Sequence, residues 1–454
     1  MKNKNLWLKL IAMALIVCTA TLLFAGCNKK AKTTVMEFTA DNGTTYTITE
    51  QEFDMLMKIR KRLIFCNLLY TPDKDNENFW STKTTKDDKE MTNEEYYKGL
   101  VMDQIKAVLV EKYLFDANGL TISQDTLDGY KTSIKTAEAN KDGMLGNFIG
   151  KGGYKQYYGY TAKLNYEIYE PMVDRSEMLY KTLCADGALC AATAESLKAY
   201  YEEHYVGYQY IMIDLKNKVV TDENGNRVVN QVTKKDENGK VVKDENGKDV
   251  MVDGDSYKTE KYDSTKEEDK AAMEKKQNLA KSILQELENK TITFEEAIAK
   301  YSDAYYSVEF PEGTFVDKES TFINTTVNDK IKNLEIGETF TEVITSGDYH
   351  YIVKRVDLKA GVYEEYEKDE NGEIKKDEEG KNIENKYFDQ FKDFEETVEY
   401  DNYEKYVESF WKEKNQITVN TAITDKYTMQ NTFLSPYVDY YYQMILYYYY
   451  GIQM

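Results

Sequence analysis

The stretch from Thr293 to Asp303 reads Thr-Phe-Glu-Glu-Ala-Ile-Ala-Lys-Tyr-Ser-Asp and predicts a short amphipathic helix. Thr293 and Glu296 have the spacing of a capping box, in which each side chain accepts a hydrogen bond from the backbone of the other residue. The apolar residues recur at helical spacing and form one stripe: Phe294, Ala297, Ile298 and Tyr301. This helix must therefore bury one face, and the sequence on both sides of it supplies partners.

The elements around this helix predict one module over residues 207–358. A strand, a long helix, a short helix and two further strands surround it: Tyr208 to Leu215, Asp269 to Asn289, Val327 to Leu334, Thr339 to Ile344 and His350 to Val356. With one more short strand between the helices, the order is β-α-α-(β)-α-β-β. Together with the helical remainder of the chain, this order predicts an α+β protein.

A low-complexity segment, residues 216–265, interrupts the module after its first strand. Asp-Glu-Asn-Gly recurs in it, with Val-Val or similar pairs between the copies: Asp222 to Gly225, Asp236 to Gly239 and Asp244 to Gly247. Asn-Gly turns a strand back on itself because its residues tolerate positive φ, so the segment predicts a solvated hairpin insertion. Calcium binding is the alternative, but the repeats lack the alternating ligands and the later Glu of an EF-hand loop.

The rest of the chain divides by composition. Residues 33–206 carry a hairpin signal at Asp41-Asn-Gly43 followed by helical patterns, and they predict a mainly helical lobe. Residues 359–392 are predicted to be a charged linker, and residues 393–428 a further helix with a closing strand. Residues 429–454 are a Tyr-rich tail, which packs on the helical lobe, lies on a membrane surface or contacts other polypeptides.

Residues 1–26 have the features of a lipoprotein signal peptide. Lysines are followed by an apolar run and by Leu22-Leu-Phe-Ala-Gly-Cys27, which resembles the bacterial lipobox whose Cys is acylated. Cys27 is therefore the predicted lipidation site, and the mature protein is expected on the outer face of the bacterial cytoplasmic membrane. A plain transmembrane anchor is the alternative, although the apolar run is short for a span of about 20 residues.

Composition limits the partners and cofactors. With 80 acidic and 59 basic residues and a net charge of −21, the chain lacks the cationic surface that nucleic acid requires. Two His and five Cys leave little material for a zinc site, so no metal or other cofactor is expected. Beyond Cys27, the cysteines are Cys66, Cys184 and Cys190; the last two either close a small loop or remain buried thiols.

Three matches in the module resemble the parvulin-type peptidyl-prolyl isomerases. Phe294 to Asp303 resembles the family's helix and following Ser-Asp, and Leu334-Glu-Ile-Gly-Glu338 resembles its Leu-x-x-Gly-Glu turn. Tyr349-His-Tyr-Ile-Val-Lys354 resembles its final Tyr-His-Ile-Ile-Lys strand. Thr47 to Phe53 and Leu197 to Glu203 are similar to the chaperone lobe of extracytoplasmic foldases of the PrsA and SurA kind. The resemblance implies a helical lobe built from both chain ends, with an inserted parvulin-like module.

The resemblance also implies a site. A parvulin binds proline in an apolar pocket beside a hydrogen-bonded set of two His, a Cys or Asp, and a Thr or Ser. Carried over by position, the second His is His350 and the Thr is Thr345, whereas Tyr210 replaces the first His and Ala304 the Cys or Asp. His350 is then either catalytic or a satisfied core residue. Asp303 either reaches the Ala304 position by a small shift or caps a helix end.

The pocket positions of the family fall on Phe315, Ile323 and Val327, which remain apolar. The resemblance implies a lipid-anchored extracytoplasmic foldase that binds unfolded or newly exported polypeptides. Its isomerisation of X-Pro bonds is expected to be weak, because two polar members of the site are replaced. The alternative is a non-enzymatic chaperone or assembly factor that uses a degenerate parvulin fold as a peptide-binding platform. The sequence leaves the oligomeric state open.

Acylation of Cys27 is testable in cells that export the protein. Cys27→Ala is expected to abolish incorporation of labelled lipid and to release or mislocalise the protein, because the lipidated sulfur is the predicted anchor. The measurements are metabolic lipid labelling and fractionation of membranes. Unchanged labelling and membrane retention in the variant would contradict the assignment.

Overall fold

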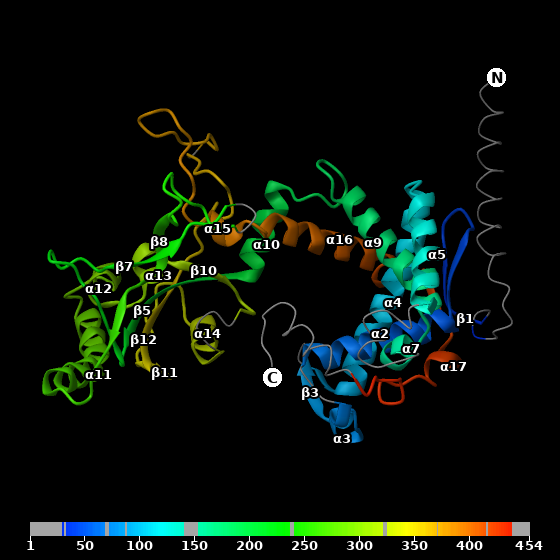
Figure 1. Ribbon diagram of the computed structural model, residues 1–454, viewed down its shortest axis with the longest axis horizontal. Helices are drawn as coiled ribbons and strands as arrows, with labels where there is room; N and C mark the ends of the chain where they lie inside the picture. Colours follow the sequence, from blue (N-terminus) through cyan, green and yellow to red (C-terminus); the bar gives the residue numbers. More distant parts are fainter. Residues whose placement is uncertain are drawn as a thin grey trace. The chain divides into compact units, whose positions relative to one another are not determined.

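The computed structural model describes residues 30, 33–68, 72–86, 89–139, 153–236, 240–320, 325–369, 371–414 and 416–437. The chain forms two compact units: unit 1 comprises residues up to Ala191 and those from Glu399 onward, and unit 2 comprises Ala192–Val398 (Figure 1). The predicted α+β class is confirmed, with unit 2 inserted into a mainly helical unit built from both chain ends. Within the described ranges, no helix is long and apolar enough to cross a membrane.

A three-stranded antiparallel sheet joins the two chain ends in unit 1. Its order is β13-β1-β2, with the bounds Ile417–Val419, Thr34–Thr39 and Thr45–Thr49. Met36 of β1 pairs with Val419 on one side and Ile48 on the other. The predicted turn joins β1 to β2, and Gly43 takes a φ of +81°, which residues with a Cβ rarely adopt.

Helices make up most of unit 1. The longer ones are α2 (Glu50–Asn67), α4 (Asn93–Ala117), α5 (Gln124–Ala139), α9 (Glu170–Leu183) and α16 (Phe394–Lys412), of which α16 begins in unit 2 and enters unit 1 at Glu399. Shorter elements are η2 (Pro72–Lys74), α3 (Glu77–Ser81), α7 (Gly153–Tyr158), α8 (Ala162–Leu164), η3 (Asn165–Tyr169), α17 (Thr421–Thr424) and the hairpin β3 (Lys83–Lys86) and β4 (Lys89–Thr92). The core mixes residues from both chain ends, since Phe38 of β1 packs edge-on against Phe410 of α16 with ring centroids 6.0 Å apart.

Lys61 of α2 is a fully buried cation at the centre of this unit. Its ammonium lies 2.7 Å from Asp75 and donates hydrogen bonds to the carbonyls of Thr432 (2.7 Å) and Gln430 (3.1 Å). Burial lowers the pKa of Lys61, while the hydrogen bond from its ammonium to Asp75 raises it. A buried ammonium needs these oxygens, so it fixes the start of the Tyr-rich tail against α2.

The described part of the tail, up to Tyr437, packs on unit 1. Met429 is fully buried, and its backbone N–H donates to Glu94 at 2.6 Å. Gly159 has a φ of +77°, and a Cβ there would collide with the Phe433 ring, so the ring lies directly on the glycine. Of the three alternatives for the tail, packing on the helical lobe is the one observed for residues 429–437. Residues 438–454 lie outside the described ranges.

Unit 2 is built on a four-stranded antiparallel sheet of order β10-β5-β12-β11. The strands are β5 (Tyr205–Asp214), β10 (Thr314–Asp317), β11 (Ile344–Ser346) and β12 (Tyr349–Val356), and the helices are α10 (Ala194–His204), α11 (Glu267–Glu288), α12 (Phe294–Tyr301), α13 (Tyr305–Glu309), α14 (Thr325–Lys332) and α15 (Phe388–Phe391). The predicted element order is present, with α13 added before β10. Of the strand predicted over Thr339 to Ile344, only Ile344 belongs to β11, and Thr339 forms an isolated bridge with Lys354 of β12.

Helices cover both faces of the central strands β5 and β12. On the face covered by α11 and α12, which we call the α11 face, the strands bury an isoleucine cluster: Ile211, Ile213 and Ile352. On the face covered by α14, the α14 face, they bury larger side chains: Val206, Tyr208, Tyr210, Tyr351 and Val353. Successive residues of a strand point to opposite faces, so each strand here serves two cores.

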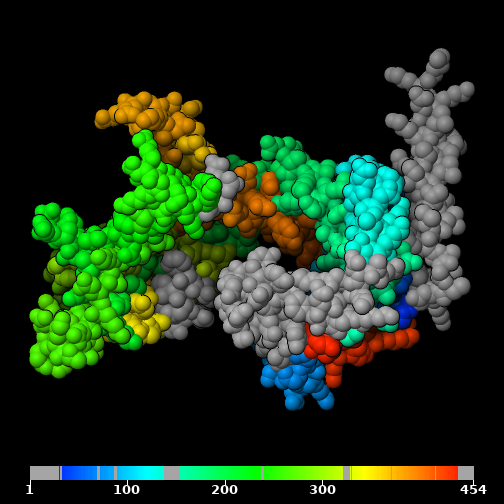
Figure 2. All heavy atoms as spheres, viewed as in Figure 1, coloured from blue at the N-terminus to red at the C-terminus, as the bar shows by residue number. Residues whose placement is uncertain are grey.

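The insertion forms hairpins on unit 2. β6 (Asn217–Val219) pairs with β9 (Thr259–Lys261), and β7 (Val229–Thr233) pairs with β8 (Met251–Tyr257). The Asp222 carboxylate accepts hydrogen bonds from the backbone N–H groups of Asn224 (2.9 Å) and Asn226 (2.8 Å), so it stabilises its own turn. Figure 2 shows the hairpins of this insertion in green, and those near residues 366–384 in orange, standing out from unit 2.

Residues 359–392 differ from the predicted charged linker. Three apolar anchors from this segment are buried in one cluster with Phe315 and Tyr201: Val362, Tyr387 and Phe391. The Tyr387 hydroxyl donates to the Gly313 carbonyl at 3.2 Å. The charged residues of this segment belong to a second group of hairpins with Asp-x-x-Gly turns, and a bridge pairs Tyr366 with Glu384. The prediction failed because the overall composition of the segment is dominated by its many solvated turn residues, which conceal the few apolar residues that are buried.

Removal of the partner of Lys61 is expected to destabilise unit 1. Asp75→Ala should lower the free energy of unfolding by about 3 kcal/mol, because a buried ammonium is left uncompensated. Urea denaturation followed by fluorescence measures this loss, since Trp80 and Trp411 both belong to unit 1.

The matched control is the ion pair of Lys83 and Glu90. It has the same 2.7 Å separation, but its side chains are 66% and 62% exposed. Glu90→Ala should change the free energy of unfolding by less than about 1 kcal/mol. Equal losses in the two variants would show that burial of Lys61 is not what matters.

Candidate functional site

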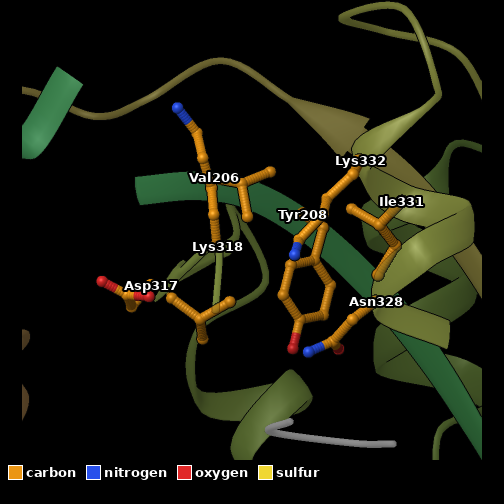
Figure 3. Close-up of a pocket in the computed structure, with 8 residues that line it drawn as sticks. Val206, Tyr208, Asp317, Lys318, Asn328, Ile331 and Lys332 are labelled. Atoms are coloured by element: carbon orange, nitrogen blue, oxygen red, sulfur yellow. The ribbon is translucent and has the colours of Figure 1, made fainter. Parts of the chain in front are cut away.

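A surface depression opens between β5, β10 and α14 on the α14 face (Figure 3). Its walls are formed by four apolar or aromatic side chains and four polar ones: Val206, Tyr208, Val316, Ile331, Asp317, Lys318, Asn328 and Lys332. The depression encloses about 180 Å³, including the part open to solvent. The depression is shallow, because three of its lining residues are almost fully buried: Val206, Tyr208 and Ile331 are 3%, 1% and 1% exposed.

Tyrosines form the floor behind this depression. Tyr208 and Tyr210 of β5 have ring centroids 6.0 Å apart, and Tyr210 shares the buried cluster with Tyr351 of β12. Burial raises the pKa of Tyr210 and Tyr351, and it raises the pKa of Tyr306 to about 12. All three phenols are therefore neutral near pH 7, and they offer no general base there.

The rim of the depression carries both charges and one buried amide. Lys318 follows Asp317 on one side of the depression, and Lys332 lies on the other side (Figure 3). The Lys332 ammonium is 3.9 Å from the Glu319 carboxylate. Asn328 is only 7% exposed, and its amide group donates to the Ser320 carbonyl. The rim thus has positive and negative groups without a strong field of either sign.

His350 and Thr345 lie on the other face of the sheet from Tyr210. They are cross-strand partners in β12 and β11, so their side chains share a face. Ile344, one residue before Thr345, is buried on the α14 face, and therefore Thr345 points the opposite way. Thr345 is exposed and His350 is half-buried. The predicted grouping of His350 and Thr345 with Tyr210 is not found.

The register of β12 explains this separation. His350 pairs with Ile213, whereas Val353 pairs with Tyr210. The strand has one residue more between His350 and Lys354 than the family's Tyr-His-Ile-Ile-Lys sequence has between its His and Lys. An offset of one residue moves a side chain to the opposite face of a sheet. Tyr351, not His350, therefore occupies the α14 face beside Tyr210.

Asp303 is held by an ion pair on the side of α11. Its carboxylate lies 2.7 Å from the ammonium of Lys276 and accepts the backbone N–H of Asp214 at 2.9 Å. Both side chains are largely buried, at 16% exposure for Lys276 and 14% for Asp303. Asp303 is therefore neither a solvent-facing cap nor a group aimed at Tyr210. The next residue, Ala304, belongs to the buried cluster on the α14 face, and its side chain has no polar atom.

Of the three predicted pocket residues, Phe315 does not line the depression. Phe315 of β10 points away from it and packs on Tyr387, with ring centroids 5.3 Å apart. Its neighbour Val316 lines the depression instead, because the strand alternates. Val327 belongs to α14, whose described side chains supply Asn328 and Ile331, while Ile323 and the lipidation residue Cys27 lie outside the described ranges. Strand alternation places Phe315 and Val316 on opposite faces, and the pairing of Val316 with Val206 decides that Val316 lines the depression.

The described residues contain no group of three or more His, Cys, Asp or Glu side chains that could hold a metal ion. The Asp residues of the Asp-Glu-Asn-Gly turns are occupied by backbone hydrogen bonds. Asp244, for example, accepts the N–H groups of Asn246 and Lys248, both at 2.9 Å.

Comparison with known proteins gives a distant likeness. No protein-family model matches the chain, and no curated protein matches it. Among solved structures, it is similar to PrsA from Bacillus subtilis at 14% identity, covering 73% of this chain and 90% of that one, with a TM-score of 0.20. It is also similar to the foldase protein PrsA from Streptococcus pneumoniae at 13% identity, covering 87% and 99%, with a TM-score of 0.20. At this TM-score the likeness assigns neither an activity nor a site.

The orientation of His350 can be tested through its pKa. Burial and the nearby Lys281 of α11 both lower this pKa from its ordinary value of 6.5. The unfolded state then binds the proton more readily, so His350 lowers stability as the pH falls below about 6.5 and has no such effect above it. NMR titration measures the pKa, and His204→Gln assigns the signals because the chain has only two histidines. A value above 6.5 would contradict packing of His350 towards α11.

Proposed function

We propose that this protein is a lipid-anchored extracytoplasmic foldase of the chaperone kind. It binds unfolded, newly exported polypeptides through the depression on unit 2, and it isomerises X-Pro bonds weakly or not at all. The observation that carries this proposal is the arrangement of side chains on the α14 face, where Tyr210, Tyr351 and Ala304 belong to the buried cluster and none of the residues that line the depression is a histidine. The non-enzymatic alternative raised by the sequence is thus the better supported one.

The chemistry of prolyl isomerisation makes the missing polar groups matter. The barrier to rotation is about 18–20 kcal/mol, and a catalyst lowers it by binding the twisted amide better than either planar form. The resemblance assigns that role to a hydrogen-bonded set with two histidines. Here His350 faces α11 and Tyr210 is a neutral phenol, so the depression lacks that set.

The same depression supports binding of an extended chain. The half-buried Val316 offers apolar contact at the surface, next to the buried Val206 and Ile331, and Lys318 and Lys332 add donors at the rim. An apolar site with a few polar groups at its edge suits segments of unfolded polypeptide whose sequences differ, because it demands only one apolar residue. No metal or other cofactor is needed for such binding.

The export signal supports the same proposal. The lipobox-like sequence before Cys27 favours an anchored protein outside the cytoplasm, where newly exported chains emerge unfolded. The acidic body, with a net charge of −21 over the whole chain, would be repelled by an anionic membrane surface and held away from it. Client chains would then reach the depression from the aqueous side.

The test combines an isomerisation assay with a holdase assay on the mature protein. NMR exchange on an X-Pro peptide is expected to show no more than a small acceleration, and His350→Ala should leave the rate unchanged. Aggregation of a chemically unfolded client should be suppressed by the wild type. A strong acceleration that His350→Ala abolishes would support a catalytic prolyl isomerase instead. A failure to suppress aggregation would overturn the chaperone proposal.

Matched substitutions on the two faces of one sheet locate the binding site. Val316→Arg places a charge in the depression and should weaken binding of a fluorescent unfolded polypeptide by about tenfold, which corresponds to about 1.4 kcal/mol. Thr345→Arg places the same side chain on the exposed, opposite face and should leave binding unchanged. Equal effects of the two substitutions would place binding elsewhere. Circular dichroism of both variants controls for folding.

A further inference from the structure

Two cysteines of unit 1 are brought together at the end of α9. Cys184 follows the last residue of the helix, and the backbone N–H of Cys190 donates to the Leu183 carbonyl at 2.8 Å. This bond closes the intervening loop and keeps the two Cα atoms within roughly 7 Å, which is about the separation that a disulfide spans. The two thiols lie within hydrogen-bonding reach of each other and are free in the structure.

The pair is held in place by the returning chain. The Cys184 sulfur lies 3.6 Å from the Glu399 carbonyl, and the Asn402 side chain donates to the Cys190 carbonyl at 3.3 Å. Cys184 is 6% exposed and Cys190 is 1% exposed. Cys66 belongs to a different environment on α2, near Arg62. The chain therefore pairs two of its three described cysteines by folding, without a third thiol between them.

We propose that Cys184 and Cys190 form a redox pair that closes to an intramolecular disulfide in an oxidising compartment. The oxidant is a small-molecule or protein disulfide. One cysteine thiolate attacks a sulfur of that disulfide and releases one thiol of the oxidant, forming a mixed disulfide. The second cysteine then attacks the mixed disulfide, forms the Cys184–Cys190 bond and releases the other thiol. Both protons of the protein thiols end on the two thiols of the reduced oxidant.

Burial decides what kind of redox pair this is. It raises the pKa of Cys184 to about 12, with the neighbouring Cys190 adding to the effect. Since the thiolate is the attacking species, exchange in the folded protein is slow, unlike that of a catalytic dithiol whose pKa is lowered. The pair thus acts as a stabilising crosslink that forms during folding or on slow oxidation, and not as a thiol-oxidoreductase site.

The crosslink would form next to the boundary of unit 1. Ala191 is the last residue of the unit before the chain enters unit 2, and Glu399 is the first after it returns. Closing the loop from Cys184 to Cys190 restricts the unfolded chain and should raise the melting temperature of unit 1 by a few degrees. The encounter with an oxidant in the cell rests on the proposed export, whereas the chemistry of the pair does not.

The experiment uses the purified mature protein with oxidised glutathione at pH 8. One arm incubates the folded protein, and a second refolds the protein from denaturant in the same buffer, so that burial cannot hide a thermodynamically favoured bond. After alkylation, trypsin releases both cysteines in the single peptide Thr182–Lys198. The expected product is this peptide without alkyl groups and lighter than the dithiol by two hydrogen atoms, together with a melting temperature a few degrees higher.

Two variants separate the outcomes. Cys66→Ala should keep the oxidised peptide, and Cys190→Ala should lose both the mass change and the shift in melting temperature. A fully alkylated peptide in both arms, or a bond from Cys66 to either cysteine, would overturn the proposal. Because the readout is made on purified protein, a failure here would leave the proposed chaperone function untouched, and a failure of client binding would leave the redox pair untouched.

Discussion

The alternation of side chains along β5 and β12 is the constraint on which unit 2 depends. Both strands are central, and each must bury one set of residues under α11 and α12 and the other under α14. An offset of one residue in β12 would exchange the two sets, so the register is fixed by both cores at once. The same alternation places Tyr351 beside Tyr210 and turns His350 away, and thus it decides what the depression can do.

Unit 1 depends on contacts between segments that are far apart in the sequence. The strand β13 closes a sheet begun by β1, and the ammonium of Lys61 binds carbonyls of residues 430 and 432. Both contacts bring the C-terminal residues onto helices formed by the N-terminal ones. An inserted unit suits this arrangement, because the chain leaves unit 1 after Ala191 and returns at Glu399. Within unit 1, these two points of the chain are joined by the hydrogen bond from Asn402 to the Cys190 carbonyl.

The hairpins are rich in charged residues, and none of their described residues belongs to the two clusters that the central strands bury. Their Asp residues accept backbone hydrogen bonds within the turns, and their strands are short and solvated. Such segments cost the fold little, since their backbone groups are satisfied locally or by water. A small number of anchors attach them to unit 2: the Arg227 side chain donates to the Ala299 carbonyl, and Tyr257 packs on Tyr305.

The sequence by itself determined the features that depend on near neighbours. The capping box at Thr293 began its helix as expected, and the Asn-Gly turns at Gly43, Gly225 and Gly247 reversed the chain where predicted. It also predicted the order of elements in the module and its place between two parts of a helical unit. Only the tertiary structure decided which face of a strand each residue occupies. That choice placed His350 and Phe315 away from the depression, because the face that a strand residue occupies depends on the register with other strands, which motif spacing does not record. Asp303 lies in a loop and is held instead by its ion pair with Lys276.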